Sequence, residues 1–354
     1  KEEGKMFLRR RNFLIILLVL SLLSSFSIAY GEDDLGSWET KTSMPTARTE
    51  LATAEIDGKI YAIGGKDTNG SSATVEEYDP TTDTWTTKTS MPTARTYYGA
   101  AEANGKIYAI GGWGIGNYDT VEEYDPTINT WTTKASMPTA TRGLGVVEVN
   151  DKIYAIGGAS DSSDYSTTVQ EYDPITNTWT INESMGTGRK ALGVAEVNGK
   201  VYAIGGRNSQ GALNTVEEYD PITNKWITKT SMPTARYSLN VAEVDGKIYA
   251  IGGYNGGYLD IVEEYDPTTD TWTTKTSMPT ARYDLGVVEA NGKIYAIGGK
   301  NDDGNLDTVE EFTITTYELD TPANLTATAG NTEVGFSWDS VTDADSYNVY
   351  RATT

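Results

Sequence analysis

The sequence predicts an all-β fold, a ring of six four-stranded blades, followed by the beginning of a second β-domain. A Gly-Gly doublet recurs six times at steps of 46 to 48 residues, and a Trp recurs six times at the same steps. Between doublets, short runs of β-branched and aromatic residues alternate with turn signals, without helical periodicity after residue 30. A fixed period of this size indicates a repeat protein, and four antiparallel strands in about 47 residues form one propeller blade.

The first 31 residues are predicted to be a secretory signal region. Arginines at 9–11 precede an apolar run over 13–23, and small residues suit cleavage after Ala29 or Gly31. A retained membrane anchor is the alternative, although the run is short for a bilayer span of about 20 residues. Met6 is the expected start. The sequence therefore predicts a secreted or cell-surface protein, touching a membrane only if the signal is retained.

The second repeat shows the four strands expected in each blade, named A to D in chain order: 98–103, 106–110, 120–124 and 130–134. Asn104-Gly105 joins strands A and B and is a strong two-residue hairpin signal. Asp125-Pro126 ends strand C, because proline cannot continue a central strand.

The phase of the repeat predicts how the ring closes. Trp38 precedes the first Gly-Gly, whereas the last Gly-Gly is followed by a strand at 309–312 but by no Trp. The sixth blade therefore lacks its own outer strand, and the N-terminal segment around 37–42 is expected to supply it. Such closure leaves no unpaired sheet edge at the joint. The predicted ring spans residues 36–316.

The repeated phrase, including Lys106–Gly112 and Val121–Pro126 with a Trp at set spacing, resembles the kelch repeat. The resemblance implies a six-bladed kelch β-propeller, here of a bacterial secreted or surface type. It also implies two functional precedents, since some kelch arginines contact acidic peptides and other kelch propellers are sugar epimerases or copper radical oxidases.

The last 37 residues, 318–354, resemble the first strands of a fibronectin type III domain. The resemblance rests on Pro322–Ala329, Val334–Trp338 and Ala344–Arg351. A complete sandwich of this kind needs about 100 residues, so the segment is expected to be a truncated fragment.

The composition excludes several kinds of chemistry. The chain has no Cys and no His, which excludes thiol and imidazole catalysis, and zinc and iron–sulfur sites. The same absences exclude the activity of a copper radical oxidase. No cofactor and no metal are expected. The formal net charge of −22 argues against nucleic acid as a partner.

Strand direction places the variable B–C loops and the D–A connections on one face, where recognition usually occurs. Six arginines begin the A strands, and a ring of guanidinium groups would bind carboxylate, sulfate or phosphate. The alternative is that they brace neighbouring loops. Arg142 stands one residue after the position of the other arginines in the repeat, which Thr141 occupies. The set is Arg48, Arg95, Arg142, Arg189, Arg236 and Arg282.

Aromatic residues gather unevenly on the same predicted face. They suit sugar rings or peptide side chains, although surface tyrosines that merely cover the blades are the alternative. The set is Tyr97, Tyr98, Trp113, Tyr118, Tyr165, Tyr237, Tyr254, Tyr258 and Tyr283.

Strand A also repeats a glutamate near the opposite rim, expected to hold a cation or to line a wet channel: Glu55, Glu102, Glu148, Glu196, Glu243 and Glu289. The paired glutamates of strand C, such as Glu76-Glu77, are expected to be solvated or to lie between blades. The repeated Trp and Gly-Gly are interpreted as packing residues.

These patterns predict a non-catalytic extracellular recognition module, a monomeric ring that binds a protein or carbohydrate ligand, anionic ligands included, through the Arg- and Tyr-bearing face. One alternative is a sugar-modifying enzyme of the sialic-acid epimerase type, which needs a carboxylate within reach of the substrate. The other is a structural or self-assembling surface spacer.

Overall fold

A computed structural model describes residues 6–9, 35–314, 326–329 and 333–337. The chain divides into two compact units, Gly36–Thr313 and a unit made of Lys1–Leu35 with Ile314–Thr354. The described residues contain strands and no helix. Accordingly, this part of the chain has no helix that could cross a membrane.

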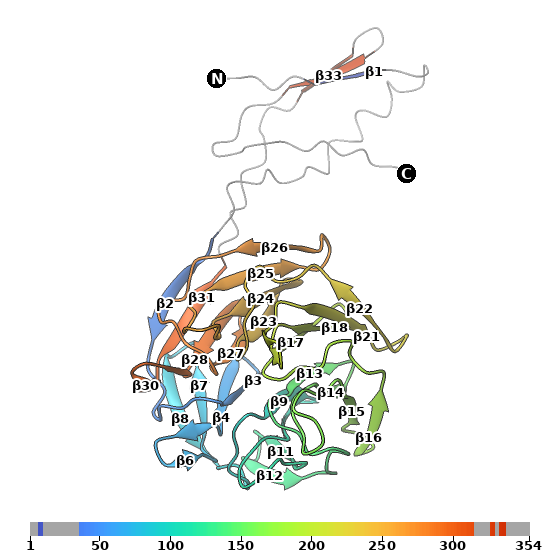
Figure 1. Ribbon diagram of the computed structural model, residues 1–354. Helices are drawn as coiled ribbons and strands as arrows, with labels where there is room; N and C mark the ends of the chain where they lie inside the picture. Colours follow the sequence, from blue (N-terminus) through green and yellow to red (C-terminus); the bar gives the residue numbers. More distant parts are fainter. Residues whose placement is uncertain (1–5, 10–34, 315–325, 330–332, 338–354) are drawn as a thin grey trace. The chain divides into compact units, whose positions relative to one another are not determined.

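The unit Gly36–Thr313 is a six-bladed β-propeller, which confirms the all-β ring (Figure 1). Each blade is one antiparallel sheet of four strands. Blade 1 contains β3 (Ala52–Ile56), β4 (Lys59–Ile63), β7 (Val75–Asp79) and β8 (Thr84–Lys88), and blade 2 contains β9 (Gly99–Ala103), β10 (Lys106–Ile110), β11 (Val121–Asp125) and β12 (Thr130–Thr133). Blade 3 contains β13 (Gly145–Val149), β14 (Lys152–Ile156), β15 (Val169–Asp173) and β16 (Thr178–Asn182), and blade 4 contains β17 (Gly193–Val197), β18 (Lys200–Ile204), β21 (Val216–Asp220) and β22 (Lys225–Lys229). Blade 5 contains β23 (Asn240–Val244), β24 (Lys247–Ile251), β25 (Val262–Asp266) and β26 (Thr271–Thr274), and blade 6 contains β27 (Gly286–Ala290), β28 (Lys293–Ile297), β31 (Val309–Thr313) and β2 (Ser37–Lys41).

The B–C loops of blades 1, 4 and 6 form short two-stranded hairpins. These are β5 (Lys66–Asp67) with β6 (Gly70–Ser71), β19 (Arg207–Asn208) with β20 (Gly211–Ala212), and β29 (Lys300–Asn301) with β30 (Gly304–Asn305). They are the three loops without aromatic residues.

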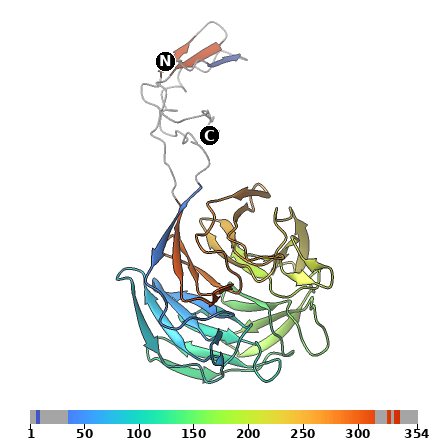
Figure 2. The ribbon, with the colours of Figure 1, turned by 60° about the vertical axis from the view of Figure 1, so that its left-hand side comes forward.

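The N-terminal strand closes the ring, as the phase of the repeat predicts. β2 is the outermost strand of blade 6 and pairs antiparallel with β31, from Ser37 opposite Thr313 to Lys41 opposite Val309 (Figure 2). The indole Nε1 of Trp38 also donates to the carbonyl of Thr276, 3.0 Å away and 238 residues later in the chain. The first and last strands of the propeller are thus tied into one sheet.

The core lies between neighbouring blades and repeats the same contacts. A tyrosine of strand C is fully buried in blades 1 to 5, and the Trp of strand D lies against it, as with Tyr78 and Trp85 at 5.0 Å between ring centroids. The Trp85 Nε1 then donates to the carbonyl of Thr42 in the preceding connection, 2.9 Å away. The repeated Trp therefore joins each blade to the one before it.

The second unit contains a separate three-stranded sheet in the order β1-β33-β32, formed by β1 (Met6–Arg9), β33 (Glu333–Ser337) and β32 (Thr326–Ala329). Two of the strands predicted for the fibronectin-like fragment overlap β32 and β33. Strand β1 lies where the sequence predicts the start of the signal region. The predicted strand at 344–351 and the apolar run at 13–23 fall outside the described residues.

Candidate functional site

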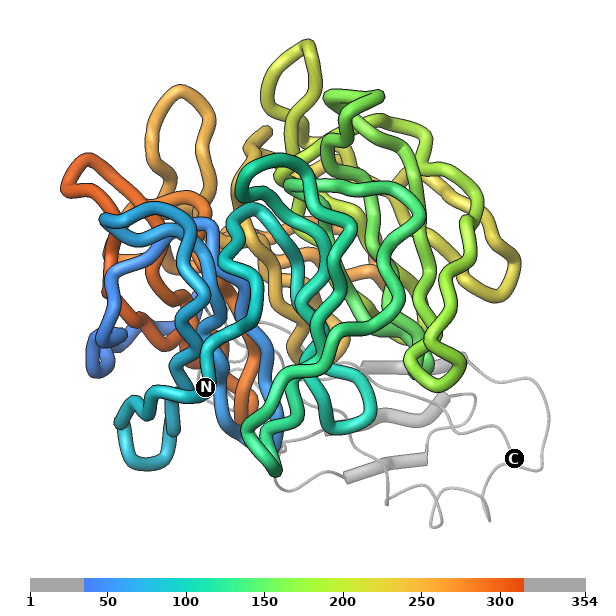
Figure 3. Tube along the Cα trace, turned by 90° about the horizontal axis from the view of Figure 1, so that it is seen from below, coloured from blue at the N-terminus to red at the C-terminus, as the bar shows by residue number. Residues whose placement is uncertain are grey.

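The blades have two distinct ends, seen from the side in Figure 3. The A–B and C–D turns share one end, here called the turn face. In blades 1 to 4 the lysine that opens strand B forms an ion pair there with the aspartate that ends strand C. Lys152 Nζ, for example, lies 2.6 Å from Asp173 Oδ2. The B–C loops and D–A connections lie at the other end, here called the loop face. This confirms the sorting of loops inferred from strand direction.

Five of the six arginines predicted to form a positive patch are completely buried, so that prediction is wrong. Arg48, Arg95, Arg189, Arg236 and Arg282 are each 0% exposed. They act as the braces that were the alternative interpretation, and no ligand can reach them.

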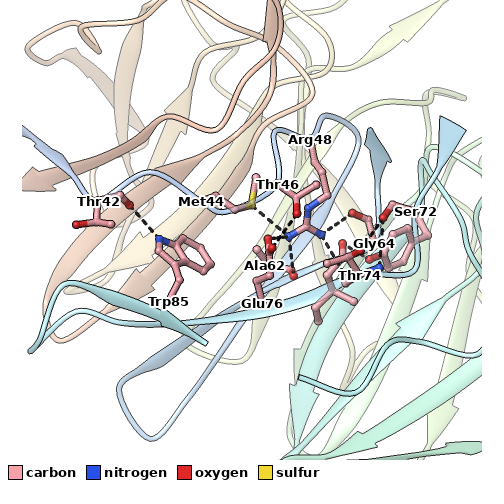
Figure 4. A network of polar contacts seen from close by, with 12 residues as sticks. Thr42, Met44, Thr46, Arg48, Ala62, Gly64, Ser72, Thr74, Glu76 and Trp85 are labelled. Atoms are coloured by element: carbon pink, nitrogen blue, oxygen red, sulfur yellow. Dashed lines mark hydrogen bonds and ion pairs between the residues drawn. The ribbon is translucent and has the colours of Figure 1, made fainter. Parts of the chain in front are cut away.

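The Arg48 guanidinium shows what each brace holds (Figure 4). Its Nη1 donates to the carbonyls of Gly64 at 2.7 Å and Thr74 at 3.0 Å, and its Nη2 lies 2.6 Å from Glu76 Oε2. One side chain therefore fastens the D–A connection to both ends of the B–C loop.

The partner of each buried arginine is the first glutamate of strand C. Of the two positions expected for these glutamates, solvated or between blades, their burial contradicts the solvated one. Glu76, Glu122, Glu217, Glu263 and Glu310 are all buried and form ion pairs with the arginines. Burial lowers the pKa of Arg48, and the Glu76 charge opposes that shift. A second bond fixes the carboxylate, since Thr46 Oγ1 donates to Glu76 Oε1 at 2.9 Å.

Blade 3 lacks both charges of this pair. Thr141 stands at the arginine position and Gln170 at the glutamate position, and both side chains are buried. The Thr139 N–H donates to Gln170 Oε1 at 2.9 Å, so the amide keeps one bond that a carboxylate would accept. Arg142 is displaced by one residue onto the loop face and is partly exposed.

In each blade, the residue after the buried arginine, or after Thr141 in blade 3, forms a backbone β-bridge with the residue that follows Gly-Gly. This geometry puts two variable side chains side by side on every blade. The pairs are Thr49 with Lys66, Thr96 with Trp113, Arg142 with Ala159, Lys190 with Arg207, Tyr237 with Tyr254, and Tyr283 with Lys300.

Three of these variable residues, Arg142, Lys190 and Arg207, form what we call the cationic arc. Each lies over one of the aromatic rings that the sequence predicts on this face. The distances from cation to ring centroid are 4.3 Å for Arg142 over Trp113, 5.0 Å for Lys190 over Tyr165 and 4.8 Å for Arg207 over Tyr237. The arc therefore alternates positive charge and aromatic surface across blades 2 to 5.

Lys190 lies close enough to Arg142 and to Arg207 to be repelled by both. Burial lowers the pKa of Lys190, and the charges of Arg142 and Arg207 lower it further against the opposing effect of Asp164. The buried Nε of Arg207 has no hydrogen-bond partner in the described chain. Like charges held together stabilise a bound anion, which would relieve their repulsion.

Four of the predicted aromatic residues meet beside the arc and are called here the tyrosine cluster. Tyr254 has ring centroids 5.6 Å from both Tyr237 and Tyr283, and Tyr258 stacks on Tyr283 at 5.7 Å. All four are partly exposed. The cluster gives blades 5 and 6 an aromatic surface with hydroxyl groups, suited to a sugar or peptide ligand.

The other predicted aromatic residues differ in exposure. Tyr98 is buried, and its hydroxyl donates to the Ile63 carbonyl, so it belongs to the core rather than to a binding surface. Tyr118 and Trp113 are partly exposed in the B–C loop of blade 2. Tyr97 is 38% exposed and lies at the channel mouth.

The mouth of the central channel is a ring of residues in the left-handed backbone conformation, including Glu50 (φ 56°), Tyr97 (φ 52°) and Asp284 (φ 50°). Backbone bonds join them from blade to blade, as from Glu50 N to Asp284 O at 2.9 Å. The channel has a volume of about 370 Å³ and is lined mainly by the A strands.

Two acidic side chains at the mouth have raised pKa values. Burial raises the pKa of Asp284 to about 7, with the Glu50 charge adding to the shift while Ser238 and Lys300 oppose it. Burial also raises the pKa of Glu50, against a hydrogen bond from Tyr97.

The glutamates of strand A lie near the turn face, as predicted, and each accepts a bond from the A–B turn. Glu243 Oε1, for example, accepts from Gly246 N at 2.7 Å. Burial and neighbouring carboxylates raise the pKa of Glu55, Glu148 and Glu243. Among the described residues, no three carboxylates come close enough to hold a metal ion.

Two family models match the propeller sequence. The model described as KLHDC2/KLHL20/DRC7 Kelch-repeats domain matches residues 24–158 and 132–299, and the Kelch motif model matches 281–318. The chain belongs to the kelch-repeat family.

Relatives of this kelch chain support the fold. A curated F-box/kelch-repeat protein of Arabidopsis thaliana is 35% identical over 65 residues, which is 18% of this chain and 17% of that protein. The match thus spans about a sixth of that relative. The solved structure titled "Structure of YjhT" covers 83% of this chain and 99% of its own, with 17% identity and a TM-score of 0.66. That likeness shows the fold alone.

Four residues of this kelch propeller's loop face were not predicted from the sequence: Lys190, Arg207, Glu50 and Asp284. They stand at positions that vary from blade to blade, so no repeated pattern marks them. Their spacing in the sequence could have indicated them. Each stands one or two residues after a buried arginine or directly after Gly-Gly, and these positions lie at the loop face in every blade.

We expect Asp284→Asn to stabilise the kelch propeller at high pH. The folded-state pKa lies above the ordinary value of 3.8, so wild-type stability falls as pH rises from about 4 to about 7. The variant lacks this loss. It should be more stable than wild type by about 2 kcal/mol at pH 8, a value that allows for partial solvent screening, and should show little gain at pH 4. Urea unfolding at both pH values checks this, and an equal difference at both would contradict it.

Proposed function

We propose that this kelch propeller is an extracellular recognition module whose loop face binds an anionic group of a protein or carbohydrate ligand. The cationic arc would hold the anion, and the tyrosine cluster would contact the neighbouring part of the ligand. The observation that carries the proposal is the gathering of Arg142, Lys190 and Arg207 in a chain whose net charge is −22. Export rests on the predicted signal region.

A binding screen with a matched charge control tests this function. The full chain is applied to an array of acidic glycans and acidic peptides, beside the variant Arg142→Gln/Lys190→Gln/Arg207→Gln. The control, Lys59→Gln/Lys106→Gln/Lys200→Gln, removes three charges from the turn face, where lysines form partly exposed ion pairs. We expect at least about 100-fold weaker binding for the arc variant, since the loss of two charge-assisted bonds of roughly 1.5 kcal/mol each already gives that factor, and unchanged binding for the control. Equal loss in both variants would refute a specific arc.

The enzyme alternative has one supporting feature, the Asp284 carboxyl beside Glu50 and Tyr97, whose pKa suits proton transfer near neutral pH. If the protein were a sugar epimerase, Asp284→Asn would abolish turnover of the bound sugar. Recognition by the arc predicts instead that ligand binding survives this change. The spacer alternative predicts concentration-dependent assembly without a saturable ligand.

A further inference from the structure

Three consecutive blades expose an isoleucine at the tip of the C–D turn. Ile128, Ile175 and Ile222 are 67%, 80% and 86% exposed, in blades 2, 3 and 4. The same turns of blades 1 and 5 carry only threonine between the proline and the following aspartate, at 81–82 and 268–269. We call the three residues the isoleucine rim. Side chains this apolar and this exposed are costly to leave in water, and their recurrence at the same turn of three neighbouring blades sets them in a row along one end of the propeller.

The outer strands of blades 3 and 4 each add one exposed isoleucine. Ile181 of β16 and Ile227 of β22 are 54% and 53% exposed. A groove of about 550 Å³ runs between blades 3 and 4 and is lined in part by Gly186, Trp226 and Ile227. Gly186 stands where the other five connections have proline, and the missing ring leaves the groove open. Blade 4 thus adds a hollow beside the rim, whose lining combines Trp226 and Ile227 with polar residues such as Glu183 and Thr228.

The centre of the same turn face is acidic. The six strand A glutamates accept bonds from turn N–H groups, as Glu196 Oε1 does from Gly199 N, and a bond of that kind leaves the carboxylate charge in place. The strand B lysines of blades 2 to 4 form ion pairs with the C–D aspartates, such as Lys200 with Asp220 at 2.7 Å. Strands spaced about 4.8 Å apart put the C–D turn about 10 Å from the A–B turn of the same blade and about 12 Å from strand A, which carries the glutamate.

We propose that the turn face of blades 2 to 4 docks a cationic amphipathic segment of a partner protein. Its apolar side chains would cover the isoleucine rim and the groove, and its lysines or arginines would face the carboxylates about 12 Å inward. A helix with its side chains is about 10–12 Å across and fits this separation. Charge complementarity selects this partner, since a second copy of a chain with net charge −22 would be repelled. The site is at the opposite end of the blades from the cationic arc.

A peptide-binding experiment on the full chain tests the proposal. The probe is an 18-residue amphipathic helix of leucine and lysine, and its charge-reversed control replaces lysine with glutamate. The variant Ile128→Thr/Ile175→Thr/Ile222→Thr installs the residue that blades 1 and 5 carry, so an unchanged melting temperature is expected. We expect at least tenfold weaker binding of the lysine peptide to this variant, no binding of the glutamate peptide, and no effect of the arc variant.

Four results would overturn the proposal. The triple threonine variant could bind the lysine peptide as tightly as wild type, or a peptide of lysine and serine could bind as tightly as the amphipathic one. Binding of phosphatidylcholine vesicles that depends on the three isoleucines, without peptide binding, would assign the rim to a membrane surface. A wild-type dimer that dissociates in the threonine variant would assign it to self-association.

Discussion

Replacing Glu122 with Gln is expected to lower the free energy of unfolding by about 3–5 kcal/mol, because the change leaves the buried positive charge of Arg95 without its ion-pair partner. Arg95 is 0% exposed and its Nη2 pairs with Glu122 Oε2. The carbonyls of Gly111 and Thr120 also accept from Arg95, but they cannot neutralise it. Urea unfolding of the full chain measures the loss.

The double variant Arg95→Thr/Glu122→Gln is the matched control. It copies blade 3, where Thr141 and Gln170 occupy the same two positions without charge. Removing both charges together should recover most of the lost stability, leaving a deficit of about 1–2 kcal/mol from the lost bonds and packing. If the single variant were as stable as wild type, or the double variant less stable than the single one, the account of the buried pair would be contradicted.

Deleting Ser37–Lys41 is expected to open the ring. The deletion removes the five-residue pairing with β31, the packing of Trp38 on Phe312 at 5.0 Å between centroids, and the bond to Thr276. It also exposes the β31 edge. We expect a fall in the melting temperature of about 10 °C or more, a broader transition, and aggregation at high concentration, measured by calorimetry and light scattering.

A replacement of the same segment controls for the deletion. Changing Ser37–Lys41 from Ser-Trp-Glu-Thr-Lys to Thr-Trp-Thr-Thr-Lys installs the sequence of β8, which pairs with an equivalent strand C. This variant should melt within a few degrees of wild type. A deletion variant as stable as the replacement would show that closure by β2 is dispensable.

The fold could be predicted from the sequence because its determinants repeat. The spacing of Trp and Gly-Gly located the blades, and the missing last Trp located the closing strand. Repetition misled the prediction of the site for the same reason. Five identical arginines at a loop end suggest a charged rim, and periodicity alone does not distinguish a repeated surface charge from a repeated buried pair.

The informative signal was covariation inside the chain. The one blade with Thr141 for arginine is also the blade with Gln170 for glutamate, which indicates that the two positions touch. The candidate site consists instead of residues that do not repeat. Arg142 and the four clustered tyrosines were found by their residue type, whereas Lys190 and Arg207 become significant only when the backbone bridge between them brings their positions together.

The most direct test separates the buried arginines from those of the cationic arc. It follows the arginine Nε–H NMR signals of the full chain while an anionic ligand from the array is added. The account predicts shifts at Arg142 and Arg207 that saturate together, with Arg48, Arg95, Arg189, Arg236 and Arg282 unchanged. Saturable shifts at the five buried arginines, with none at Arg142 and Arg207, would contradict it.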